Sequence, residues 1–127
     1  MSIIRNIVAI FLFTFSAFAL NAQAPKPNQA PVVQNIIPIQ EVFSGHYFEF
    51  TIADNTFSET DQDDYISSYE AVLFNGDKLP QWIYFDAKTL KFWGKPEKKE
   101  KGEYYITIKA YDSHNAVAVT ELYLKVN

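Results

Sequence analysis

A run of carboxylates between residues 54 and 64 is the part of the sequence whose residue types could do chemistry. It contains no lysine or arginine, and its acidic members are Asp54, Glu59, Asp61, Asp63 and Asp64. Side chains of one sign at this density repel each other unless water or a cation screens them. Ca²⁺ takes about six to eight oxygen ligands from carboxylates, carbonyls and amides. The run therefore indicates either a calcium site or a solvated acidic loop.

The other reactive residue types do not form a catalytic set. Cysteine is absent, which excludes disulfides, thiolate metal sites and cysteine nucleophiles. The two histidines are His46 and His114; His114 follows Asp112 by two positions without a third partner, so we interpret it as a turn residue. A carboxylate pair could serve a glycoside hydrolase, but a domain this small is not expected to form the cleft. The sequence predicts a protein that is not an enzyme.

The charge pattern also bears on partners. The formal net charge of −4 disfavours a nucleic-acid backbone as a ligand. Lysines are dense only between residues 95 and 103, where glutamates alternate with them. Mixed signs are typical of a solvated hairpin loop rather than a phosphate or DNA patch. We therefore expect no nucleic-acid partner.

Residues 1–24 have the pattern of a secretory signal peptide. Arg5 supplies the positive charge, residues 7–18 are mostly apolar, and small residues follow, which leaves the cleavage site open between Ala19 and Ala24. A membrane anchor is the alternative, but the apolar stretch is shorter than the about 20 residues of a spanning helix. We expect a secreted or periplasmic protein of the cell envelope, with no transmembrane span after cleavage. Prolines over residues 25–31 predict a stiff linker.

Residues 32–127 have room for one domain, and their pattern has a period of two. Apolar and polar side chains alternate over residues 47–52, 104–111 and 118–126, and shorter strands are expected over residues 67–74, 82–85 and 90–93. A first strand is expected within residues 32–42. No segment has the spacing of apolar residues that is typical of an amphipathic helix. About seven short strands separated by turn residues predict an all-β sandwich of immunoglobulin type. Four aromatic residues are expected in its core: Phe48, Phe50, Trp82 and Phe92.

Five segments carry a family resemblance. They are GHYFEFTI at 45–52, NTFSETDQD at 55–63, LPQWIYFD at 79–86, TLKFWGKP at 89–96 and GEYYITIKAYD at 102–112. In this order and spacing they resemble the dystroglycan-type cadherin-like domain, also described as a putative Ig domain of bacterial secreted and surface proteins. The resemblance covers residues 32–127, so the expected domain is a cadherin-like β-sandwich.

The resemblance implies a metal site and a role. In cadherin-like domains the loop after the second strand and the turn before the last strand lie near the same end. The implied Ca²⁺ ligands are Glu59, Asp61, Asp63 and Asp112, with Asn55 and Asp64 as further candidates. The implied function is a non-catalytic binding or cell-adhesion module, with a protein or glycan partner at the cell envelope.

A second interpretation comes from tyrosines near the C-terminus. If Ile106 and Leu122 point inward, Tyr105, Tyr111 and Tyr123 point outward. Exposed aromatic side chains stack on sugar rings or dock proteins, which would make the domain a small carbohydrate-binding module. The alternative is cross-strand pairing that only strengthens the sheet.

Overall fold

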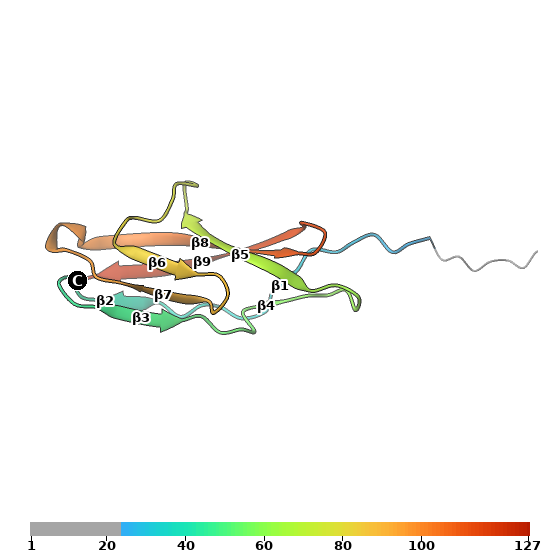
Figure 1. The fold of residues 1–127 in the computed structure, drawn as a ribbon, viewed down its shortest axis with the longest axis horizontal. Coiled ribbons are helices and arrows are strands. Elements are labelled where there is room, and N and C mark those ends of the chain that lie inside the picture. Colours follow the sequence, from blue (N-terminus) through green and yellow to red (C-terminus); the bar gives the residue numbers. More distant parts are fainter. Residues whose placement is uncertain (1–23) are drawn as a thin grey trace, which may run out of the picture.

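The computed structural model describes residues 24–127 of the chain (Figure 1). The predicted signal peptide lies outside the described residues apart from Ala24. Between residues 24 and 127 no helix is long and apolar enough to span a membrane. The elements are β1 (Val32–Val33), β2 (Gln40–Val42), β3 (Phe48–Thr51), β4 (Phe57–Ser58), β5 (Ile66–Leu73), β6 (Ile83–Asp86), β7 (Lys91–Gly94), the short 3₁₀ helix η1 (Lys98–Glu100), β8 (Gly102–Asp112) and β9 (Val117–Val126).

Two sheets and one short strand pair make up the fold. One sheet has the order β2-β9-β8-β5, the other has the order β3-β7-β6, and β1 pairs with β4. All pairs are antiparallel except β2 with β9. The long β8-β9 hairpin forms the centre of the four-stranded sheet, and β6 and β7 run in nearly the same direction and overlap it in the view of Figure 1. The prediction of an all-β, immunoglobulin-like sandwich is confirmed.

The core lies between the two sheets and follows the predicted alternation. The four-stranded sheet contributes four buried side chains: Ile106, Ile108, Leu122 and Leu124. In the three-stranded sheet the fully buried Phe92 stacks on Phe50, with ring centroids 5.2 Å apart. Burial of side chains this large is the main term that stabilises a domain without disulfides.

Trp82 packs edge-on against two other rings at the border of the core, where it is partly buried rather than fully enclosed as predicted. Its ring lies 6.3 Å from Phe48 and 5.1 Å from Tyr104. Gly94 makes this packing possible, because a Cβ there would collide with the main-chain carbonyl of Trp82. The glycine in the Phe-Trp-Gly segment is therefore a requirement of close strand approach.

The chain between residues 32 and 42 differs from the single strand expected there. It forms two short strands, β1 and β2, which pair with β4 and β9 respectively. Pro38 lies between them and has no N–H to donate, so a continuous ladder through this position is disfavoured. Splitting the segment raises the strand count of residues 24–127 to nine, two of which have only two residues.

Candidate functional site

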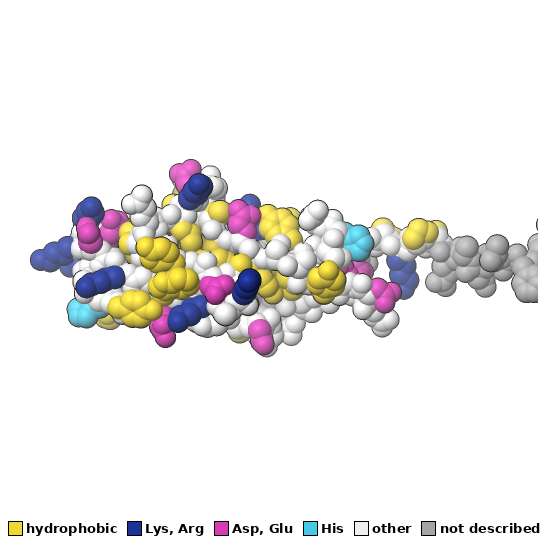
Figure 2. All heavy atoms as spheres, viewed as in Figure 1, with side chains coloured by type: hydrophobic (Ala, Val, Ile, Leu, Met, Phe, Trp, Pro, Cys, Tyr) yellow, Lys and Arg dark blue, Asp and Glu magenta, His cyan; other side chains and the backbone are white. Residues whose placement is uncertain are grey.

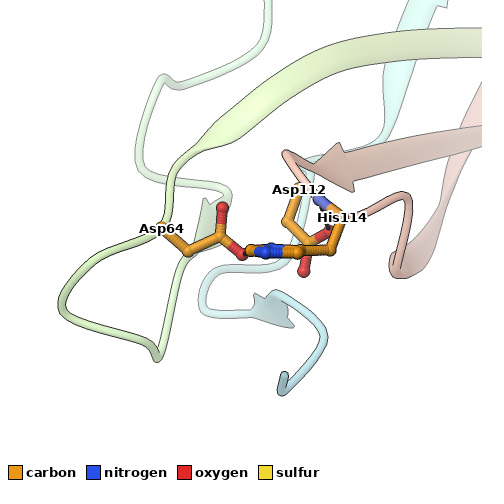
Figure 3. A group of neighbouring side chains, drawn as sticks. All are labelled: Asp64, Asp112 and His114. Carbon is orange, nitrogen blue, oxygen red and sulfur yellow. Dashed lines mark hydrogen bonds and ion pairs between the residues drawn. The ribbon is translucent and has the colours of Figure 1, made fainter. Parts of the chain in front are cut away.

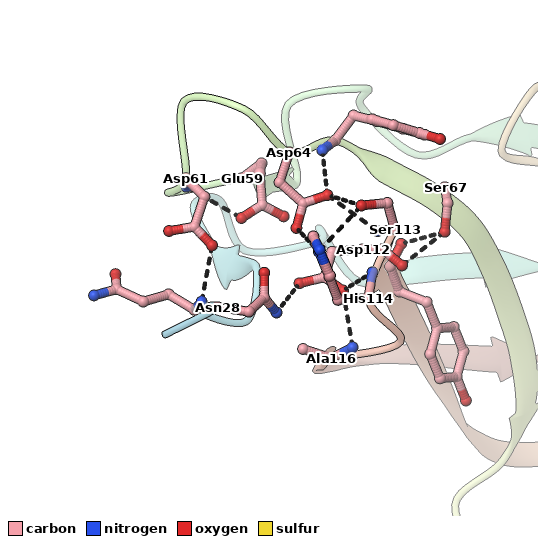
Figure 4. Close-up of polar contacts among 12 residues, drawn as sticks. Asn28, Glu59, Asp61, Asp64, Ser67, Asp112, Ser113, His114 and Ala116 are labelled. Atoms are coloured by element: carbon pink, nitrogen blue, oxygen red, sulfur yellow. Dashed lines mark hydrogen bonds and ion pairs between the residues drawn. The ribbon is translucent and has the colours of Figure 1, made fainter. Parts of the chain in front are cut away.

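Carboxylates from distant parts of the chain converge at one end of the sandwich, which we call the acidic end. It consists of Glu59, Asp61 and Asp64 from the loop between β4 and β5, and Asp112 at the end of β8. The turn from β8 to β9 and residues of the N-terminal segment complete it (Figure 4). An open hollow of about 850 Å³ lies here, lined among others by Asn28, Asp61 and His114.

Asp112 is fully buried and organises the turn that follows it. Its Oδ1 accepts hydrogen bonds from the main-chain N–H groups of His114 at 2.9 Å and Ala116 at 2.8 Å. Its Oδ2 accepts from the Asn28 side-chain amide at 2.8 Å. A buried carboxylate requires such donors, because an unpaired one loses its hydration without compensation. Asp112 thereby fastens both the β8-β9 turn and the N-terminal segment to the acidic end.

Asp64 is partly buried, and its side chain is only 2% exposed. It accepts hydrogen bonds from the Tyr65 N–H at 2.7 Å, the Ser113 N–H at 3.1 Å and the Ser113 hydroxyl. These donors, the Ser113 hydroxyl first, hold the pKa of Asp64 well below its usual range. Asp64 is therefore ionised throughout the physiological pH range.

His114 lies against Asp64 (Figure 3). Its Nδ1 is 3.0 Å from Asp64 Oδ2, and this contact raises the pKa of His114 above its ordinary value. His114 is thus a turn residue, as predicted, and it also pairs with a carboxylate of the acidic end. Asp64, Asp112 and His114 each offer a ligand atom, and these atoms lie within 4.8 Å of one another.

Glu59 has one oxygen that its neighbours do not satisfy. Its Oε1 accepts from the N–H groups of Thr60 at 3.0 Å and Asp61 at 3.2 Å. Its Oε2 is buried and has no hydrogen-bond partner among the described residues. Ligand oxygens of Glu59, Asp61 and Asp64 lie within 4.8 Å of one another. Close carboxylates with an unpaired buried oxygen form the kind of donor set that a hard cation fills.

The structure brings together only some of the residues that the resemblance implies. Glu59, Asp61 and Asp112 lie at the acidic end, and so does Asp64. Exposed Asp63 belongs to neither of the two ligand groups found among residues 24–127. Asn55 uses its main-chain oxygen to accept from the Asn35 side chain at 2.7 Å.

The N-terminal segment contributes to the acidic end, which the sequence did not predict. Besides the bond from Asn28 to Asp112, the Gln29 N–H donates to Asp61 Oδ2 at 2.8 Å. Nothing in a proline-rich stretch indicates such contacts, because they join residues 84 and 32 positions apart.

The predicted tyrosines lie on the outer face of β8 and β9. Tyr105 and Tyr123 are directly opposite in register, as expected, with ring centroids 5.2 Å apart and planes at 51°. Phe74 meets Tyr105 edge-on at 81°. The Glu103 carboxylate raises the pKa of Tyr123 to about 12. The Tyr111 hydroxyl donates to Glu70 at 3.1 Å, so this tyrosine serves the β5-β8 pairing.

Comparisons with known proteins agree with this architecture. The sequence family described as "Putative Ig domain" matches residues 30–127. No curated protein sequence matches the chain.

Several solved structures are similar. One is a putative alpha-galactosidase from Bacteroides fragilis, with 24% identity and a TM-score of 0.52, over 79% of this chain and 18% of that one. Another is an endo-fucoidan hydrolase of glycoside hydrolase family 107, with 19% identity and a TM-score of 0.62, over 79% and 17%. A third contains fibronectin(III)-like modules of Clostridium thermocellum CbhA, with 17% identity and a TM-score of 0.51, over 77% and 47%. The chain thus spans less than a fifth of the two enzymes, and these similarities establish the fold alone.

Proposed function

The chain belongs to the "Putative Ig domain" family, and from that premise we propose that it is a non-catalytic binding module whose acidic end holds Ca²⁺. The observation that carries the cation is the buried, unpartnered Oε2 of Glu59 beside Asp61 and Asp64. The finer assignment to dystroglycan-type cadherin-like domains, with a role in adhesion, belongs to this proposal.

The donor chemistry favours Ca²⁺ over softer metals. The group of Glu59, Asp61 and Asp64 offers only carboxylate oxygens, which suit Ca²⁺, whereas Zn²⁺ sites more often include nitrogen or sulfur. Asp112 lies outside this group, and its three hydrogen bonds come from the β8-β9 turn and from Asn28. Its proposed role is to hold the turn and Asn28 in place around the ion. Glu59, Asp61 and Asp64 are the residues proposed to contact it.

The proposed setting is the cell envelope, with a protein or glycan as partner. Two similar structures are carbohydrate-active enzymes of which this fold is a small part. That likeness supports a role as an accessory or binding domain in carbohydrate metabolism outside the cytoplasm. The hollow at the acidic end is open and lined mostly by polar and charged residues, unlike the enclosed, mostly apolar pockets that bind small molecules.

Calorimetric titration of Ca²⁺ into the purified protein tests the proposed site. We expect one ion per chain. In Glu59→Gln, which removes a charged ligand and keeps the shape of the side chain, the Kd for Ca²⁺ should rise about tenfold or more. Asp63→Asn is the matched control, because it makes the same change of charge in the same loop outside the ligand groups. Absence of saturable binding at millimolar Ca²⁺, or equal loss in both variants, would overturn the site.

A second candidate function is carbohydrate binding through Tyr105, Tyr111 and Tyr123. It is supported by the cross-strand pair of exposed Tyr105 and half-buried Tyr123, with exposed Phe74 beside it. Glycan pull-down with Tyr105→Ala and Tyr123→Ala tests it, and equal capture of the variants and the parent would remove it.

A further inference from the structure

The outer face of the β3-β7-β6 sheet carries aromatic residues where a sandwich usually exposes polar ones. Across the three strands Glu49, Trp93 and Tyr84 lie directly opposite one another in register. Their neighbours Phe48, Phe92 and Ile83 point into the core, so alternation places this row outward. Figure 2 shows hydrophobic side chains gathered over this sheet.

The two rings of the row are nearly parallel. Trp93 and Tyr84 have ring centroids 5.6 Å apart and planes at 19°, and Tyr84 is 53% exposed. The rings of Tyr105 and Tyr123 on the other sheet are instead inclined at 51°. The two rings stack on each other on the outside of the sheet, and the exposed part of such an electron-rich pair attracts the polarised C–H groups of a sugar ring.

Polar groups border the aromatic pair. Lys91 Nζ lies 2.7 Å from Glu49 Oε2, and the two side chains are 39% and 53% exposed. The Tyr47 hydroxyl donates to the same Glu49 oxygen at 3.0 Å. The Lys91 ammonium lowers the pKa of Glu49, and Glu49 raises that of Lys91, so both stay charged near neutral pH. The border thus offers both an acceptor and donors to a hydroxylated ligand.

We propose that the surface formed by Tyr47, Glu49, Tyr84, Lys91 and Trp93, here called the aromatic face, binds a neutral carbohydrate chain. The charges of Glu49 and Lys91 cancel, so the face has no excess of cations with which to attract a polyanion. An apolar protein surface would strip water from the exposed ion pair at a cost in free energy. Sugar hydroxyls replace that water with hydrogen bonds while the rings stack on the sugar. The inference goes beyond the calcium proposal and uses none of its residues.

Affinity electrophoresis in native gels tests this face. The probes are galactomannan and mixed-linkage β-glucan as neutral chains, with alginate as the anionic chain. We expect at least one neutral polysaccharide to retard the protein, with alginate having no effect. Trp93→Ala should weaken that retardation about tenfold, the change that loss of one stacking ring produces. Tyr84→Phe keeps the ring and should keep the retardation.

Controls separate this face from the other proposals. Tyr105→Ala lies on the opposite sheet and should migrate like the parent, and chelator should change nothing, because the cation site is at the acidic end. Melting curves of each variant exclude loss of the fold as the cause. Normal migration of the folded parent in both neutral gels would overturn the proposal. The proposal would also be overturned if folded Trp93→Ala were retarded as strongly as the parent, or if Tyr105→Ala alone lost the retardation.

Discussion

The acidic end and the aromatic face keep their carboxylates charged in two different ways. Asp64 is 2% exposed and is held by main-chain N–H groups and the Ser113 hydroxyl. Glu49 is half exposed and is held by the Lys91 ammonium. The carboxylates of the acidic end outnumber their one histidine partner, His114, so negative charge remains there, whereas Lys91 cancels the charge of Glu49. The acidic end therefore has an uncompensated charge for a cation, and the aromatic face does not.

The two regions also differ in how far their contacts reach. The acidic end joins the N-terminal segment, the loop before β5 and the turn after β8 through hydrogen bonds between residues far apart in the sequence. The polar contacts of the aromatic face link neighbouring strands at the surface. Loss of a carboxylate is thus expected to destabilise the fold more at the acidic end than at the aromatic face.

The largest effect is expected from Asp112→Ala. It leaves the N–H groups of His114 and Ala116 and the Asn28 amide without their acceptor, and unsatisfied donors of this kind cost about 3 kcal/mol or more in total. The melting temperature in chelator should fall by roughly 10 °C or more. Glu49→Ala, on the exposed aromatic face, is the matched control and should melt close to the parent. An equal fall in both variants would contradict the contrast between the two regions.

A smaller effect is expected from pH. The Asp64 contact raises the pKa of His114 in the folded state, so its stabilisation is fully present below the unfolded pKa of about 6.5 and is lost as pH rises through the folded value. In chelator the melting temperature should fall between pH 6 and pH 9, and His114→Gln should remove that fall. Lys91→Met is the control, because the Glu49–Lys91 pair stays charged over this range. A slope that persists unchanged in His114→Gln would show that another group causes it.

Alternation in the sequence was enough to orient the strands. It assigned Ile106 and Leu122 to the core and Tyr105 and Tyr123 to the outside, and the register of β8 and β9 confirms the pairing of the tyrosines. Successive side chains in a strand point alternately to opposite faces of the sheet, so assigning one residue to a face assigns the others in that strand.

Loops carry no such rule, and there the sequence was less informative. Asp63 and Asp64 are neighbours of the same type, yet only Asp64 has a side chain shielded to 2% exposure and hydrogen-bonded to Ser113, 49 positions away. The stacking of Tyr84 on Trp93 depends on the register of the β6-β7 hairpin. That register is set by a turn in which Leu90 has a φ of 60°, a conformation that leucine seldom adopts. Neither feature has a local signature.

The most direct test of a cation at the acidic end is the melting temperature of the protein with Ca²⁺ and with chelator. An ion present at 100 times its Kd stabilises the folded state by about 2.7 kcal/mol. For a domain of this size that raises the melting temperature by about 10 °C or more. We predict such a rise with Ca²⁺ but not with Mg²⁺, its loss in Glu59→Gln and its retention in Asp63→Asn. An unchanged melting temperature up to millimolar Ca²⁺ would contradict the account and leave the acidic end as solvated surface.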